Sequence, residues 1–194
     1  LMGRSTGTSF IDISAPATPI YLGDLPTHTS SSDWRDIRVY NDHAFIVSEA
    51  TNHGLQIFDL RTLRSVANPP AVFSETAHLA TFGSAHNIAI NEESGFAYIV
   101  GANVCSGGLY IVDIQDPTNP VEAGCFADDG YTHDVQCVMY SGPDTDYSGR
   151  EICFAYNEDT LTIVDVTDKA SPQQISRFSY SGVAYSHQGR LAKS

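Results

Sequence analysis

A short motif that ends in aspartate recurs four times along the chain, at intervals of about fifty residues. Each aspartate follows a run of branched apolar residues, and the four are Asp12, Asp59, Asp113 and Asp165. Such runs are typical of buried strands, so we predict strands at 9–13, 55–60, 109–114 and 161–166. Proline turns follow three of the four motifs. The motif aspartate should cap each turn, because an aspartate side chain accepts hydrogen bonds from the backbone just after it.

Further candidate strands flank each motif and make it part of a four-stranded unit. One follows the turn, at 20–25, 71–73, 121–126 and 174–178. Two more precede the motif in the complete copies, at 36–40 with 44–49, 87–90 with 96–102, and 134–140 with 151–156. A lone strand is expected at 184–191. Four antiparallel strands in a repeat of about fifty residues, with no helical periodicity, are typical of a β-propeller blade.

The predicted fold is therefore all-β, with 1–194 as a single β-propeller domain that forms part of a ring. We expect two strands of one blade at 1–26, three whole blades at 34–82, 84–128 and 131–179, and the first strand of another blade at 184–194. The complete ring should have six or seven blades. Further blades, a signal peptide and any anchor would then lie outside this sequence.

The charge of the chain excludes several classes of partner. It carries 10 Lys and Arg against 23 Asp and Glu, which gives a net charge of −13. Nucleic acids and anionic membranes attract clustered basic residues, so we expect neither as a partner. No apolar run approaches the ~20 residues of a membrane-spanning helix, and we expect no direct membrane insertion from this segment.

The four cysteines are Cys105, Cys125, Cys137 and Cys153, and none forms a CxxC pair. Cys137 and Cys153 fall on two strands of one hairpin, roughly opposite each other, at a separation that a disulfide could bridge. Cys105 and Cys125 should reach the same rim of the preceding blade. We therefore predict Cys105–Cys125 and Cys137–Cys153. A Cys125–Cys137 bridge between blades and four free thiols remain the alternatives, and only disulfides would fit an exported protein.

Four segments around the predicted inner strands look like a known family. They are 34–40 (WRDIRVY), 85–88 (AHNI), 131–137 (YTHDVQC) and 186–189 (SHQG). Together with the motif strands, they resemble the LVIVD-repeat propellers of the choice-of-anchor B group. The resemblance implies an exported bacterial protein, secreted or displayed on the cell surface by one of several C-terminal anchors. It implies no established reaction.

Aligning the predicted inner strands brings polar residues into two columns near the propeller axis. The first column contains Arg35, His86, His133 and His187, and the second contains Asp36, Asn87, Asp134 and Gln188. The loops that should share this rim add Glu49, Asn52, His53, Asn103, Glu158 and Asp159. His28, His43 and His78 fall in loops outside the columns, where we expect them to be solvated.

The histidine column allows three interpretations. Three imidazoles that meet at one point could bind zinc or a transition metal, with the neighbouring amides and carboxylates orienting the rings. They could instead line a metal-free polar pocket. They could also tie neighbouring blades together by bonding to backbone groups. A blade-tying role predicts rings buried between strands, with no shared cavity.

These observations favour a binding or scaffolding module that presents its rim to a protein or glycan. The alternative is a metal-binding propeller or metalloenzyme with an axial histidine site. A calcium-dependent hydrolase ranks lower, because the column is mainly histidine, and calcium prefers oxygen ligands. The acidic loop with Asp144 and Asp146 lacks the ligand spacing of a calcium site and should be a plain hairpin loop. No nucleophile or phosphate-binding motif is present, so a binding role is favoured over an enzyme, and the metalloenzyme stays the alternative.

Overall fold

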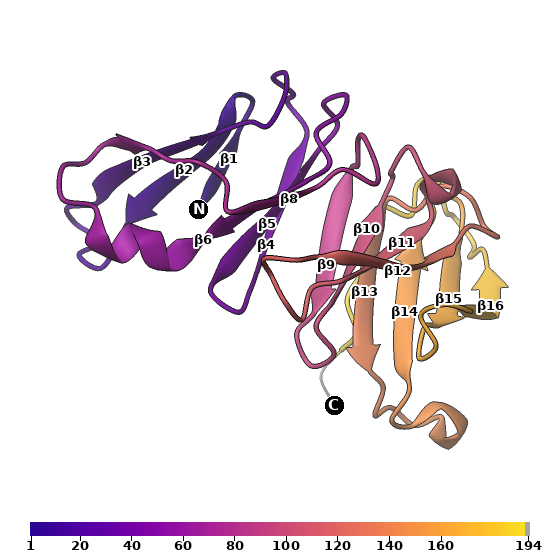
Figure 1. The fold of residues 1–194 in the computed structure, drawn as a ribbon. Helices are drawn as coiled ribbons and strands as arrows, with labels where there is room; N and C mark the ends of the chain where they lie inside the picture. Colours follow the sequence, from indigo (N-terminus) through magenta and orange to yellow (C-terminus); the bar gives the residue numbers. More distant parts are fainter. Residues whose placement is uncertain (193–194) are drawn as a thin grey trace.

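The computed structural model describes residues 1–192, and these residues form four four-stranded sheets (Figure 1). Sheet A contains β1 (Met2–Arg4), β2 (Gly7–Asp12), β3 (Ile20–Pro26) and β7 (Ala71–Val72). Sheet B contains β4 (Arg35–Tyr40), β5 (His43–Ser48), β6 (Leu55–Asp59) and β8 (Ala77–Leu79). Sheet C contains β9 (Asn87–Asn91), β10 (Phe96–Val100), β11 (Leu109–Asp113) and β12 (Val121–Phe126). Sheet D contains β13 (Asp134–Met139), β14 (Glu151–Tyr156), β15 (Leu161–Asp165) and β16 (Gln173–Phe178).

The helical content of the described residues consists of three short 3-10 turns. They are η1 (Leu60–Ser65), η2 (Cys105–Gly107) and η3 (Thr145–Tyr147). All neighbouring strands pair antiparallel except β3 and β7, which pair parallel. The prediction of an all-β fold is therefore confirmed. No helix in the part of the chain that the structure describes is long and apolar enough to cross a membrane.

The four motif strands form as the repeat predicts, as β2, β6, β11 and β15. Each motif aspartate accepts a hydrogen bond from the backbone N–H two residues later, at 2.8–2.9 Å, which confirms its turn-capping role. Three of the four motif strands also carry a β-bulge at the same motif position, just before the residue that precedes the aspartate. The four copies of the motif thus share a local structure as well as a sequence pattern.

Three expectations about strands are wrong. Residues 71–73 do not complete sheet B, because β7 pairs parallel with β3 of sheet A, and β8 takes the fourth place in sheet B. The first blade has a further strand, β1, which pairs with β2. The 184–191 segment forms no strand and makes only an isolated bridge between Ser186 and Glu158, since the described residues provide no following strand to pair with it. Residues 193–194 of the expected last segment lie outside the described residues.

The position of β7 has a local cause in β3. Gly23 pairs with Ala71, and a Cβ at Gly23 would collide with the backbone of Ala71. Gly124 of β12 has the same relation to the backbone of Lys169, which lies in the turn of sheet D. In both cases, the connection that leads to the last strand of one sheet lies against the preceding sheet. A glycine is required there because the two backbones approach so closely.

The core consists of apolar clusters between neighbouring sheets. Phe10, Phe45 and Tyr98 are among the largest side chains with no exposed surface, and they belong to three separate clusters. The first strands of sheets B, C and D, which are β4, β9 and β13, also contact one another in that order. The sheets therefore stand side by side with these three strands at the inner end, as the ribbon shows (Figure 1).

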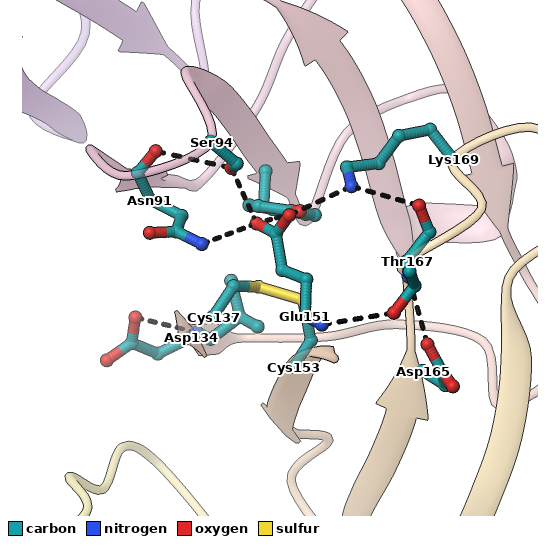
Figure 2. Close-up of a disulfide and its surroundings, with 11 residues drawn as sticks. Asn91, Ser94, Asp134, Cys137, Glu151, Cys153, Asp165, Thr167 and Lys169 are labelled. Carbon is teal, nitrogen blue, oxygen red and sulfur yellow. Dashed lines mark hydrogen bonds and ion pairs between the residues drawn. A yellow bond between two sulfur atoms is a disulfide. The ribbon is translucent and has the colours of Figure 1, made fainter. Parts of the chain in front are cut away.

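A buried carboxylate joins sheets C and D (Figure 2). Glu151 accepts hydrogen bonds from Asn91 and Tyr98 of sheet C at 2.6 Å and from Ser94 at 2.8 Å, and Lys169 lies 2.9 Å away. Burial raises the pKa of Glu151, but these four partners outweigh burial and leave it below its ordinary value. Removing one partner would leave a buried charge unpaired, which is costly.

Both predicted disulfides are present. Cys105 is bonded to Cys125 and Cys137 to Cys153, with Cα–Cα distances of 5.8 and 4.0 Å, and there is no free cysteine. The second bridge joins directly opposite residues of β13 and β14 (Figure 2). The first joins η2 to the end of β12 in sheet C. The Cys125–Cys137 alternative and the free-thiol alternative are therefore wrong.

Candidate functional site

The inner ends of sheets B, C and D surround a cleft of about 550 Å³, which we call the histidine cleft. Four elements contribute to it: the start of β4, the residue after β5, the start of β9 and the segment before β13. The C-terminal segment closes one side. The lining residues are Trp34, Arg35, Asp36, Glu49, His86, Asn87, Tyr131, His133, Tyr185 and His187. All three histidines of the predicted column therefore meet in one cavity.

His86 and His133 form the centre of the cleft. Their ring centroids lie 4.4 Å apart, and their two Nε2 atoms face each other at 3.0 Å. The opposite nitrogen of each ring is bonded to the protein: His86 Nδ1 lies 2.6 Å from Glu49 Oε1, and His133 Nδ1 lies 3.0 Å from the carbonyl oxygen of His187. Both rings thus direct Nε2 to the same point.

The strands hold these two histidines in place through their backbones. The N–H of His86 donates to Val100 and that of His133 to Tyr156, so each is paired with the second strand of its own sheet. His133 is buried, and burial together with His86 and His187 lowers its pKa. A neutral His133 ring is therefore favoured at pH 7.

His187 is placed differently from the other two. Its ring centroid lies 4.0 Å from that of His133, but the polar contact between them is made by the His187 backbone oxygen. His187 lies in a segment without strand structure, whereas His86 and His133 immediately precede β9 and β13. Within residues 1–192, no group of three or more His, Cys, Asp or Glu is arranged to hold a metal ion.

Gly101 makes room for the cleft. It has a φ of +59°, and a Cβ placed on it would lie 2.6 Å from Cβ of His86 and 3.0 Å from the hydroxyl of Tyr131. A larger residue would therefore push two lining side chains out of place. The left-handed backbone would also be strained for a residue with a side chain.

Two segments of the chain match a known family. The family model of the LVIVD repeat matches residues 82–128 and 148–179. The matched segments cover sheet C and most of sheet D, and they include His86 and Glu151. A search of curated proteins gives no significant match.

The second predicted column joins neighbouring sheets. Asp36 accepts from the backbone N–H of Ile88 at 3.3 Å, and Asn87 donates to Asp134 at 3.3 Å. Asp134 is buried and also accepts from Val135 and Arg190. The residue after each column position thus joins neighbouring sheets, in addition to the contact of His86 with Glu49. Gln188, the last member of the column, is exposed.

The predicted rim loops are only partly at the cleft. Glu49 bonds to His86, and Glu158 accepts from the hydroxyl of Tyr185 at 2.8 Å. Asn52 and Asn103 line a separate cavity, where Asn103 Oδ1 accepts from the backbone of residues 83 and 84. Asp159 is exposed and lies 3.8 Å from Arg177. These three side chains point away from the cleft because loop direction, unlike strand direction, does not follow from the repeat.

His53 was expected at the rim but is fully buried beside the cleft. Its Nε2 lies 3.0 Å from Nη1 of Arg35, and its Nδ1 lies 3.0 Å from the carbonyl oxygen of Gly54. Burial lowers the pKa of His53 to about 4, and Arg35 adds to this effect. His53 therefore supports Arg35 from behind as a neutral ring.

The three histidines expected in solvated loops are also in defined environments. His43 begins β5 and is buried, with Nδ1 2.7 Å from the carbonyl oxygen of Asn41. His28 stacks on His78 at 3.6 Å and contacts Glu75, while Nε2 of His78 lies 2.7 Å from the carbonyl oxygen of His53. We call His28, His53 and His78 the N-terminal histidine cluster. The expected hairpin loop with Asp144 and Asp146 is confirmed, since Asp144 caps the short turn η3.

Three aromatic residues of the cleft were not predicted. Trp34, Tyr131 and Tyr185 have exposed fractions of 60%, 39% and 46%, which is high for large aromatic side chains. A signal for two of them is present in the sequence, because each tyrosine precedes a column histidine by two residues. Residues two apart on an extended segment point to the same side. That rule, applied to the column, identifies Tyr131 and Tyr185.

Proposed function

We propose that this chain is part of an exported β-propeller of the choice-of-anchor B type and that it binds a partner in the histidine cleft. Four sheets of one repeat, standing side by side with their first strands innermost, support a propeller. Two disulfides support an oxidising, extracellular location. No Ser, Thr or Cys is among the described residues that line the cleft, which favours binding over catalysis.

The observation that carries this proposal is the set of exposed aromatic rings around polar groups. Trp34, Tyr131 and Tyr185 offer apolar faces, while Arg35, Glu49 and the histidines offer hydrogen bonds. Binding sites combine apolar area with a few polar groups in this way, and Trp, Tyr and Arg supply most of the energy in binding hot spots. Of a protein and a glycan, the concave shape favours the glycan, whose rings present both C–H faces and hydroxyls.

The test is a glycan-binding screen followed by titration calorimetry with tag-free protein. Tyr185→Ala should weaken binding about tenfold or more, since a residue of this kind contributes over 1 kcal/mol at an interface. Tyr180→Ala is the matched control, because Tyr180 is equally exposed at 47% but does not line the cleft. Binding that responds equally to both variants, or only to protein partners, would contradict the glycan-binding cleft.

A further inference from the structure

The two Nε2 atoms of His86 and His133 cannot both present lone pairs to each other at 3.0 Å without a positive species between them. Nδ1 of His86 is bonded to a carboxylate and Nδ1 of His133 to a carbonyl, and both of these partners only accept hydrogen bonds. Each Nδ1 therefore carries a proton. In the neutral form of each ring, Nε2 is then an unprotonated acceptor.

We propose that a zinc ion binds between His86 Nε2 and His133 Nε2. Metal-binding histidines characteristically donate the other ring N–H to a carboxylate or a backbone carbonyl, which fixes the tautomer and the ring direction. Glu49 and the His187 carbonyl are the two partners of this kind. The separation of the nitrogens also fits, because two ligands at 2.0–2.1 Å from a tetrahedral zinc lie roughly 3.3 Å apart.

The surroundings complete the argument for a metal. The site opens into the histidine cleft of about 550 Å³, which leaves room for the other zinc ligands to come from solvent or a bound molecule. The net charge of −13 attracts cations. A proton shared between the two rings is the competing species, and it would make His86 a cation paired with Glu49. This inference goes beyond the proposed function, because zinc can bind whether or not the cleft takes a glycan.

The test is titration of the tag-free, metal-stripped protein with zinc chloride, followed by calorimetry. We expect one zinc per chain, with His86→Ala and His133→Ala each weakening binding about 100-fold or more, and Glu49→Gln about 10- to 100-fold. His78→Ala is the control, since the ring of His78 contacts only the N-terminal histidine cluster and the backbone. Its zinc affinity should equal that of the unsubstituted chain.

A second measurement keeps the test valid if the buried His133→Ala variant does not fold. In the unsubstituted chain, zinc should shift the ¹⁵N resonances of Nε2 in His86 and His133 and leave the ring signals of the N-terminal histidine cluster unchanged. The proposal is overturned if no stoichiometric zinc binds, or if zinc shifts other rings instead. Glycan binding that persists without zinc leaves the proposed function intact, so the two proposals fail separately.

Discussion

The N-terminal half of the molecule, sheets A and B, and the C-terminal half, sheets C and D, each use three histidines in different ways. In the N-terminal histidine cluster, the ring contacts stay within the two sheets and their loops, and His53 is buried behind Arg35. In the histidine cleft, two ring nitrogens face each other beside an open cavity. The same residue type therefore packs against neighbouring groups in one half and forms a candidate binding site in the other, where the two Nε2 atoms face each other beside a cavity.

The two halves also differ in covalent bonds. Both disulfides lie in sheets C and D, with sequence separations of 20 and 16 residues. In the chain-entropy account, loops of this size give about 3 kcal/mol each. Reduction should therefore lower the free energy of unfolding by up to about 6 kcal/mol. In native-state hydrogen exchange, β11 and β15 should lose more protection than β2 and β6, and equal losses in all four strands would remove this distinction between the halves.

The second expected effect concerns His53. His53→Ala should lower the free energy of unfolding by about 3 kcal/mol, because it opens a cavity and removes the acceptor of Nη1 of the half-buried Arg35. His86→Ala should cost less than about 1 kcal/mol, since that ring faces the cleft. Urea unfolding of both variants measures the difference. A larger loss for His86→Ala would reverse the roles that we assign to the two groups of histidines.

The third expected effect is a pH dependence. The pKa of His53 is about 4 in the folded state, below the ordinary 6.5, so between these values only the unfolded chain binds the proton. Stability should therefore fall as pH drops from 6.5 toward 4, by about 2 kcal/mol between pH 7 and pH 5. His53→Gln should remove that part of the slope, as measured by urea unfolding across this range. The pKa of His133 is also lowered, so His133 should make stability depend on pH in the same direction. The His53→Gln variant should keep this smaller dependence.

The smallest expected effect separates the energetic cost of a steric contact at the cleft from the cost of a side chain on a left-handed backbone. Gly101→Ala and Gly130→Ala both place a side chain on a left-handed backbone, with φ of +59° and +66°. Nothing lies within 4 Å of a Cβ at Gly130, so that variant should lose only about 1 kcal/mol. Gly101→Ala should lose about 2 kcal/mol and should also displace His86. Equal losses in thermal unfolding would show that the contact with His86 has no energetic weight.

The parts of the fold that could be predicted from the sequence depend on local pattern. The branched apolar runs before Asp113 and Asp165 determine their own strands, and the aspartates cap the next turn. The Cys137–Cys153 disulfide followed from strand position, and the Cys105–Cys125 disulfide followed from the rim that a loop and a strand end were expected to share. The pairing of β7 could not be predicted in this way. It depends on the close approach of two distant segments, which the missing side chain of Gly23 allows opposite the backbone of Ala71.

The same distinction holds for the candidate site. The column alignment places His86 and His133 at equivalent positions, immediately before β9 and β13, and their rings face each other in the structure. It misplaced His53 and Asp159, since they lie in loops whose side chains are directed by contacts with Arg35 and Arg177. Residue type was also a poor guide to burial, because a histidine in a predicted loop was expected to be solvated. His43, buried at the start of β5, shows that burial depends on the neighbouring sheet as well as on polarity.

The alternation at the inner strands has a consequence for how such a protein can change over evolutionary time. Immediately before β9, His86 lines the cleft, and the next residue, Asn87, bonds to Asp134 of the adjacent sheet. The proposed binding and the Asn87–Asp134 contact between sheets thus depend on different residues, although these are neighbours in the chain. Arg35 already occupies the position that histidine takes in the following sheet, while Asp36 beside it still bonds to Ile88. If the cleft binds a ligand as proposed, single replacements at this position of each repeat would change its preference and leave the contacts of Asp36 and Asn87 between sheets in place.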